Sequence, residues 1–79
     1  MAWTETPARL EREFQFVDFR AAMAFLNRVA EVAEAHGHHP EIFNIYGTVR
    51  LTLTTHDAGN TVTNKDHKLA AAIDAVVDA

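Results

Sequence analysis

The spacing of apolar residues changes along this chain, and the order of those changes restricts the fold that the chain can adopt. In residues 9–16, apolar and polar side chains alternate, so that Leu10, Phe14 and Phe16 fall on one side. This period of two residues is typical of a half-buried β-strand. Arg12 interrupts the apolar side of the strand.

Two further runs predict a β-hairpin. Residues 42–46 and 48–54 are rich in β-branched and aromatic residues and flank Gly47. Short runs of this composition on either side of a glycine are a hairpin signal. A short additional strand is expected around Trp3.

Helical spacing occupies the two remaining stretches. Residues 19–35 follow a possible N-cap, Asp18, and precede a stop signal, Gly37. The apolar positions of this helix are Phe19, Ala22, Met23, Leu26, Val29, Ala30 and Ala33. Near the C-terminus, residues 63–66 resemble a capping box with aspartate in place of glutamate, and a second apolar stripe follows.

The order strand, helix, hairpin, helix lacks the spacing of parallel βαβ units. It predicts an α+β fold in which a four-stranded antiparallel sheet carries two helices on one face. We expect residues 1–79 to form a single domain. A chain this short, without cysteine, has little buried area of its own, so a homodimer or homotetramer is expected.

Charge and hydropathy exclude several classes of partner. The 7 basic residues are scattered and outnumbered by 11 acidic ones, which argues against nucleic acid. No apolar run approaches the roughly 20 residues that span a membrane. The first residues lack the basic and apolar regions of a signal peptide, so a cytoplasmic protein is expected.

Four of the five histidines lie within residues 36–56, at positions 36, 38, 39 and 56. If the hairpin turns at Gly47 alone, residue 38 faces residue 56, whereas a two-residue turn places residue 38 opposite residue 55. In either register His38 and His39 approach the same end of the hairpin as His56. An imidazole exchanges protons near neutral pH, so such a cluster is suited to acid–base catalysis.

Two other interpretations of the cluster stay open. The His-His-Pro run can be a polar loop after a helix, with histidine favoured near the negative end of the helix dipole. Alternatively, His36, His38 and His56 are candidate zinc ligands, although no acidic or thiol ligand accompanies them at a matching spacing. His67 is expected at the surface, whereas Phe43 and Tyr46 are expected in the core or an interface.

The segment 38–46, His-His-Pro-Glu-Ile-Phe-Asn-Ile-Tyr, resembles the central block of the pterin-4a-carbinolamine dehydratases. Residues 53–56, Leu-Thr-Thr-His, resemble the family's second block, and Asp66 matches its carboxylate. The resemblance extends from about residue 3 to residue 77. Ile42 replaces the family's tryptophan, and the family's N-terminal helix has no counterpart before Trp3.

The resemblance implies an enzyme that converts 4a-hydroxytetrahydropterin to quinonoid dihydropterin and water, without a cofactor or metal. It implies a small-molecule pterin as the partner. The implied catalytic residues are His38, His39 and His56, with His39 mainly a binding residue, and the implied substrate contacts are His39, Pro40, Tyr46 and Asp66. A non-catalytic binding or dimerisation module of the same fold is the alternative, as is a histidine metal-binding protein.

Overall fold

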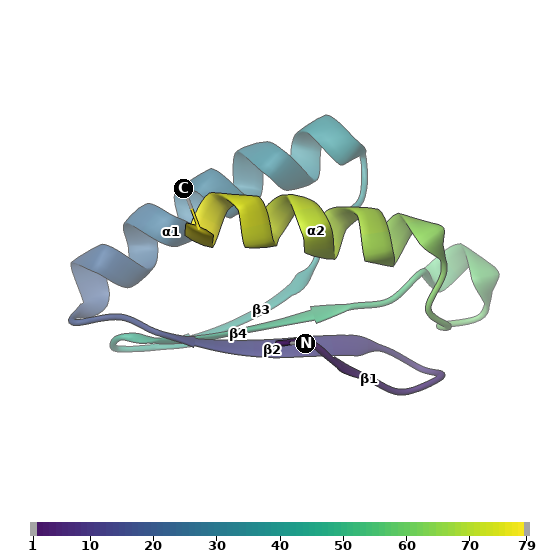
Figure 1. The fold of residues 1–79 in the computed structure, drawn as a ribbon, viewed down its shortest axis with the longest axis horizontal. Coiled ribbons are helices and arrows are strands. Elements are labelled where there is room, and N and C mark those ends of the chain that lie inside the picture. Colours follow the sequence, from purple (N-terminus) through teal and green to yellow (C-terminus); the bar gives the residue numbers. More distant parts are fainter. Residues whose placement is uncertain (1, 79) are drawn as a thin grey trace.

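The computed structural model describes residues 2–78, without the side chain of Asp78, as an antiparallel sheet covered on one face by two helices (Figure 1). The strands are β1 (Thr4–Glu5), β2 (Leu10–Gln15), β3 (Glu41–Ile45) and β4 (Thr48–Leu53), in the spatial order β1-β2-β4-β3. The helices are α1 (Phe19–His36), α2 (Asn64–Asp78) and a single 3₁₀ turn, η1 (His56–Ala58). The predicted α+β class, the four-stranded sheet and the short strand beside Trp3 are confirmed.

The core lies between the sheet and the helices. Alternate residues of β2 and β4 point toward the helices, because successive side chains of a strand project to opposite faces. The fully buried sheet residues are Leu10, Val49, Leu51 and Leu53, and the helices add the apolar residues Ala22, Val29, Leu69 and Ile73. The intervening residues of β4 leave the other face of the sheet polar.

Helix α1 begins and ends where its cap residues predict. The Asp18 carboxylate accepts a hydrogen bond from the Ala21 N–H, and Gly37 terminates the helix with φ of 60°, a conformation that glycine adopts readily. Among the described residues, neither long helix is apolar enough over sufficient length to cross a membrane.

The buried stripe of α1 differs from the predicted one. Phe19, Met23 and Ala30 are exposed, whereas Phe25, absent from the predicted stripe, is buried. The reason is aromatic packing: the Phe25 ring lies 4.8 Å from that of Phe14 and 5.0 Å from that of Phe16, between centroids. Phe14 of β2 and Phe16, directly after this strand, thus select the face that α1 buries.

The hairpin uses the two-residue register. Ile45 pairs with Thr48, so the turn consists of Tyr46 and Gly47. Tyr46 adopts φ of 50°, unusual for a bulky residue, and the Asn44 side chain donates hydrogen bonds to the carbonyls on either side of Gly47. Gly47 is required for a different reason, because a Cβ there would lie 2.3 Å from the Phe16 carbonyl oxygen.

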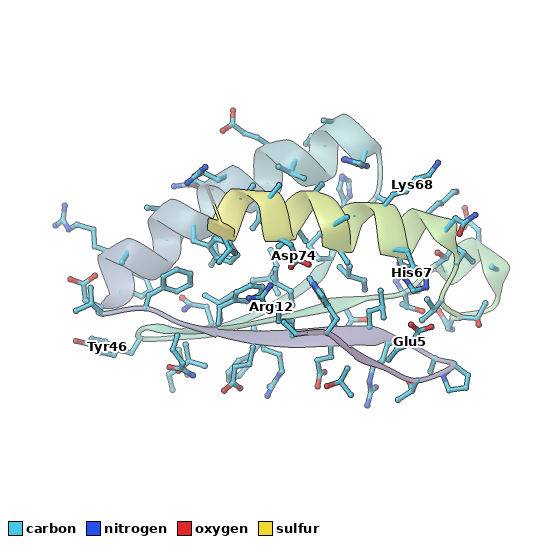
Figure 2. The ribbon with its side chains drawn as sticks, viewed as in Figure 1. Glu5, Arg12, Tyr46, His67, Lys68 and Asp74 are labelled. Carbon is cyan, nitrogen blue, oxygen red and sulfur yellow. The ribbon has the colours of Figure 1, made fainter. Side chains whose placement is uncertain are left out.

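Arg12 interrupts the apolar side of β2 because it has a partner on α2. Its guanidinium lies 2.5 Å from a carboxylate oxygen of Asp74, which also accepts a hydrogen bond from the Trp3 indole at 2.8 Å. Figure 2 shows Arg12 reaching from the sheet toward Asp74. The same guanidinium packs over the Phe14 ring at 4.4 Å. These contacts connect the N-terminal segment, the sheet and α2.

Candidate active site

Asp66 is the buried centre of the site. It lies in the first turn of α2 with no exposed surface, although aspartate is seldom fully buried without partners. Its Oδ1 lies 2.6 Å from Nε2 of His38, and its Oδ2 accepts hydrogen bonds from the Thr55 hydroxyl at 2.7 Å and the Thr63 N–H at 2.9 Å. The bond from Thr63 confirms that Asp66 caps the helix, and the bond to His38 gives it a second role.

The hydrogen bonds to Asp66 keep it ionised. Burial by itself raises the pKa of Asp66, but the hydrogen bonds from His38, the Thr63 backbone and Thr55, together with the charge of His38, lower this pKa below 3.8. An ionised carboxylate only accepts hydrogen bonds, so the proton of the His38 contact resides on Nε2. In the described residues, every buried side-chain nitrogen and oxygen has a hydrogen-bond partner. Nδ1 of His38 has no such partner, so this nitrogen is not buried and reaches the surface.

His39 and His56 are exposed, and each has one fixed nitrogen. Nε2 of His39 makes a short contact with the Glu34 carboxylate, from the last turn of α1. Nδ1 of His56 lies 2.6 Å from the Asn60 side-chain oxygen. A side-chain amide oxygen accepts hydrogen bonds, so Nδ1 of His56 carries a proton and Nε2 is the nitrogen left for a ligand.

The three histidines line one pocket of about 200 Å³, together with Gly37, Thr55, Asp57 and Lys65. The fold brings them there from two directions. His38 and His39 lie between the end of α1 and the start of β3, and His56 follows the end of β4, which pairs with β3. The structure therefore joins the histidines whose proximity the hairpin register predicts.

Other residues proposed from the sequence lie elsewhere. Tyr46 sits in the turn at the far end of the hairpin, five strand residues from Pro40, and is 67% exposed (Figure 2). It does not line the histidine pocket within one chain. Pro40 directly precedes β3 and does not line this pocket either. Phe43, like Tyr46, is exposed rather than part of the core.

The proposed zinc ligands are not assembled as a cluster. His36 ends α1 and does not line the pocket with His38 and His56. In the part of the chain that the structure describes, no three histidine, cysteine or acidic side chains come together in a way that could hold a metal ion.

Sequence reasoning missed the groups that hold the histidines. Glu34, Thr55 and Asn60 each contact a site residue through the side chain. Local signals point to two of these three residues: Thr55 directly precedes His56, and Asn60 lies four residues after His56, at the close of one short loop. Neither signal identifies the hydrogen-bonded atom.

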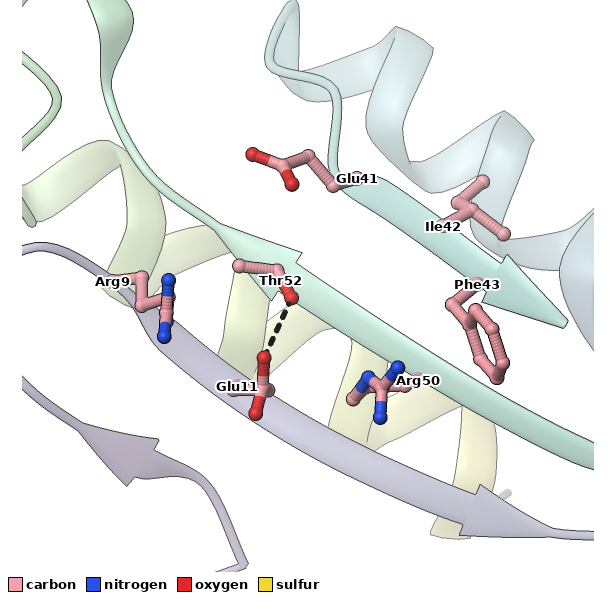
Figure 3. A pocket seen from close by; sticks show the side chains of 7 residues that line it. All are labelled: Arg9, Glu11, Glu41, Ile42, Phe43, Arg50 and Thr52. Carbon is pink, nitrogen blue, oxygen red and sulfur yellow. Dashed lines mark hydrogen bonds between the residues drawn. The ribbon is translucent and has the colours of Figure 1, made fainter.

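A larger hollow, of about 350 Å³, lies on the open face of the sheet (Figure 3). Its lining includes Arg9, Glu11, Glu41, Arg50 and Thr52. Figure 3 shows the hydrogen bond from Thr52 to Glu11, which is 3.1 Å long. This hollow contains no imidazole and its opposite charges balance, so the group best suited to proton transfer lies in the smaller histidine pocket.

Comparison with known sequences identifies the family. The family described as "Pterin 4 alpha carbinolamine dehydratase" matches residues 1–76. A relative from Acidobacterium capsulatum, assigned provisionally by its name to the pterin-4-alpha-carbinolamine dehydratases, is 53% identical over 76 residues, which cover 96% of this chain and 82% of the relative. A similarly named relative from Solibacter usitatus is 49% identical over 95% of this chain and 78% of its own length.

Two solved structures share the fold. A transcriptional coactivator/pterin dehydratase from Brucella melitensis is 39% identical, with a TM-score of 0.87 over 95% of this chain and 81% of its own. A pterin dehydratase-like protein identified as a RuBisCO assembly factor of the alpha-carboxysome is 28% identical, with a TM-score of 0.74 over 94% and 84%. The chain belongs to the pterin-4a-carbinolamine dehydratase family.

Proposed function

We propose that this protein dehydrates a 4a-hydroxytetrahydropterin to the quinonoid dihydropterin. The observation that carries the proposal is the pocket in which three imidazoles meet, one of them bonded to a buried, ionised carboxylate. Membership of the family and the names of the relatives support the same reaction.

The reaction needs two proton transfers. One proton is delivered to the 4a-hydroxyl, so that the C4a–O bond breaks and water leaves. The other is removed from a ring nitrogen, whose electron pair then forms the C=N bond. We assign the two transfers to His38 and His56, which the family resemblance implies as the acid and the base. Each of them has one nitrogen fixed by a protein partner and one left toward the pocket or the solvent. The protons balance without a redox group, so the scheme requires no cofactor.

The supporting residues take different parts. His39 is proposed to hold the substrate, with Glu34 fixing the orientation of its ring. Both oxygens of Asp66 are committed to protein donors, so its contacts favour an effect through His38 rather than direct contact with the pterin. Pro40 and Tyr46 stay predicted substrate contacts by family resemblance. Tyr46 lies too far along the hairpin to reach the histidine pocket of its own chain, so this contact requires the pocket of another chain.

The proposal is tested by a dehydration assay. The 4a-hydroxytetrahydropterin is generated immediately before mixing, and its loss is followed by absorbance with and without protein. The expected result is a rate above the enzyme-free blank that rises linearly with protein concentration. Because this substrate class also dehydrates spontaneously, equal rates in the blank and in the protein sample would count against the function.

A non-catalytic binding role is the second candidate. It is favoured by the structural similarity to the RuBisCO assembly factor and to a protein described as a transcriptional coactivator. The retention of His38, His39 and His56 favours catalysis instead. The binding role fits if the wild type is inactive in the assay and if the double variant that replaces His38 and His56 keeps the wild-type fold.

We also propose that the protein is a homo-oligomer that uses the edge of β3. Within residues 2–78 this strand has a neighbour on one side only, and the hydrophobic side chains along it and its turn are exposed: Ile42, Phe43, Ile45 and Tyr46. An exposed apolar edge strand favours pairing with another chain. Light scattering at micromolar concentration is expected to give a mass of two or four chains for the wild type, and a lower mass for Ile45→Lys. A monomeric wild type contradicts the proposal.

A further inference from the structure

Thr55 occupies an unusual position in the fold. It lies between β4 and η1, two residues beyond the last residue of β4, where it forms an isolated β-bridge with Thr61, yet it is only 5% exposed. Threonine at the end of a strand is ordinarily at the surface. Burial of its hydroxyl is tolerable only because the hydroxyl has partners.

The hydroxyl belongs to a chain of hydrogen bonds with a fixed direction. Thr55 Oγ1 lies 2.7 Å from Asp66 Oδ2 and 2.7 Å from Thr63 Oγ1. A hydroxyl has a single proton, and the ionised carboxylate only accepts, so the Thr55 proton points to Asp66 and Thr63 donates to Thr55. Oδ2 is thereby occupied, and Oδ1 is held toward Nε2 of His38.

The backbone of Thr55 holds the other histidine. Its N–H donates to the Thr61 carbonyl at 3.0 Å, and its carbonyl accepts from the Ala58 and Asn60 N–H groups at 3.2 and 3.1 Å. These bonds close the loop that contains His56 and bring Asn60 to within 2.6 Å of the His56 ring. One residue therefore contacts the supports of both His38 and His56.

We propose that Thr55 is a positioning residue, whose hydroxyl orients the Asp66 carboxylate and through it fixes the His38 ring for proton transfer. The catalytic consequence rests on the proposed dehydratase function, whereas the orientation of His38 does not. Without the hydroxyl, Oδ2 loses its hydroxyl donor and keeps only the Thr63 N–H, so the carboxylate is no longer held by two donors on that side.

Three variants test this role. Thr55→Val removes the hydroxyl and keeps the branched shape, and Thr55→Ser keeps the hydroxyl and removes the methyl group. Thr54→Val is the matched control, because Thr54 is also buried (8% exposed) and its hydroxyl donates to the Ala8 carbonyl, away from Asp66. Circular dichroism and thermal melting establish that each variant is folded.

The first measurement is the NMR signal of the His38 Nε2 proton shared with Asp66, assigned by its absence in His38→Gln. We expect this signal to be lost or strongly broadened in Thr55→Val, and retained in Thr55→Ser and Thr54→Val. This arm gives a result even if the protein has no dehydratase activity. An unchanged signal in folded Thr55→Val overturns the inference; if that variant does not fold, loss of the signal in folded Thr55→Ser overturns it.

The second measurement is the dehydration rate. In Thr55→Val we expect kcat to fall about tenfold, the scale of one hydrogen bond to a carboxylate, with KM little changed. Thr55→Ser is expected to restore kcat to within about threefold of wild type, and Thr54→Val to leave it near wild type. An active wild type whose Thr55→Val variant keeps full kcat overturns the catalytic role of Thr55. A wild type that does not exceed the blank instead refutes the proposed function and leaves the NMR result standing.

Discussion

Replacing Asp66 by asparagine tests the network at its centre. Oδ2 of Asp66 accepts two hydrogen bonds, from Thr55 and the Thr63 N–H, so the amide oxygen of asparagine is expected to occupy that site. The NH₂ group then takes the place of Oδ1 and faces Nε2 of His38. Two donors cannot share one hydrogen bond, so His38 must move its proton to Nδ1 or lose the contact.

The cost follows from the bonds that change. A hydrogen bond to a charged group contributes roughly 1.5–3 kcal/mol to stability, and the bond to His38 loses that charge. We expect Asp66→Asn to lower the free energy of unfolding by about 2–3 kcal/mol. In a domain of this size each kcal/mol shifts Tm by about 4–8 °C, so the melting temperature should fall by roughly 10–20 °C. The altered His38 tautomer should lower kcat by on the order of 10²-fold.

Thermal and urea unfolding, followed by circular dichroism, measure the change in stability. Glu31→Gln is the matched control, because it makes the same carboxylate-to-amide change at an exposed position of α1 and should alter stability by less than about 0.5 kcal/mol. An Asp66→Asn protein as stable as this control, with an unchanged His38 signal, would refute the reasoning.

The pH dependence has a definite sign. The folded-state pKa of Asp66 lies below its ordinary value of 3.8, so the ionised group stabilises the fold above that pH. This contribution is lost as the pH falls from about 3.8 through the lower, folded-state pKa. The stability difference between wild type and Asp66→Asn should therefore shrink as the pH falls below about 3.8. A difference that grows in that acid range contradicts the assignment.

Other changes test separate parts of the account. His38→Ala and His56→Ala should each lower kcat on the order of 10²-fold, whereas His39→Ala should mainly raise KM, as steady-state kinetics will show. Gly47→Ala should destabilise the fold by about 1–3 kcal/mol in urea unfolding, because its Cβ would lie 2.3 Å from the Phe16 carbonyl oxygen. Activity should survive dialysis against a chelator, and a loss restored by zinc would favour a metal site.

The fold was predictable from the sequence because its strongest signals are local and agree with one another. Alternation in residues 10–16 predicts β2, and the cap at Asp18 and the stop at Gly37 bound α1. The hairpin about Gly47 was also predicted, with its register left open between a one-residue and a two-residue turn, and the structure has the latter. The face that α1 buries was less predictable. Phe19 and Phe25 are equally apolar, and the rings of Phe14 and Phe16, against which Phe25 packs, decide that Phe25 is inside.

The candidate site was predictable in part for the same reason. Hairpin register brings His38 and His56 to one end of the sheet, and this follows from counting residues. The network around Asp66 does not follow from counting, because residues far apart in the chain supply its donors and their distances depend on how α2 packs. For Tyr46 the sequence misleads: Tyr46 is close to His38 and His39 in the sequence motif, but it lies at the far end of the hairpin.

The most direct test of the central claim is the dehydration rate of the double variant with alanine at both His38 and His56. A single variant can retain activity if the other histidine protonates the hydroxyl, but the double variant removes both proposed proton carriers. With spontaneous dehydration subtracted and the fold verified by circular dichroism, the account predicts no rate above the blank in the double variant and a clear excess in the wild type. A double variant with kcat near that of the wild type would contradict the assignment of the chemistry to these two histidines.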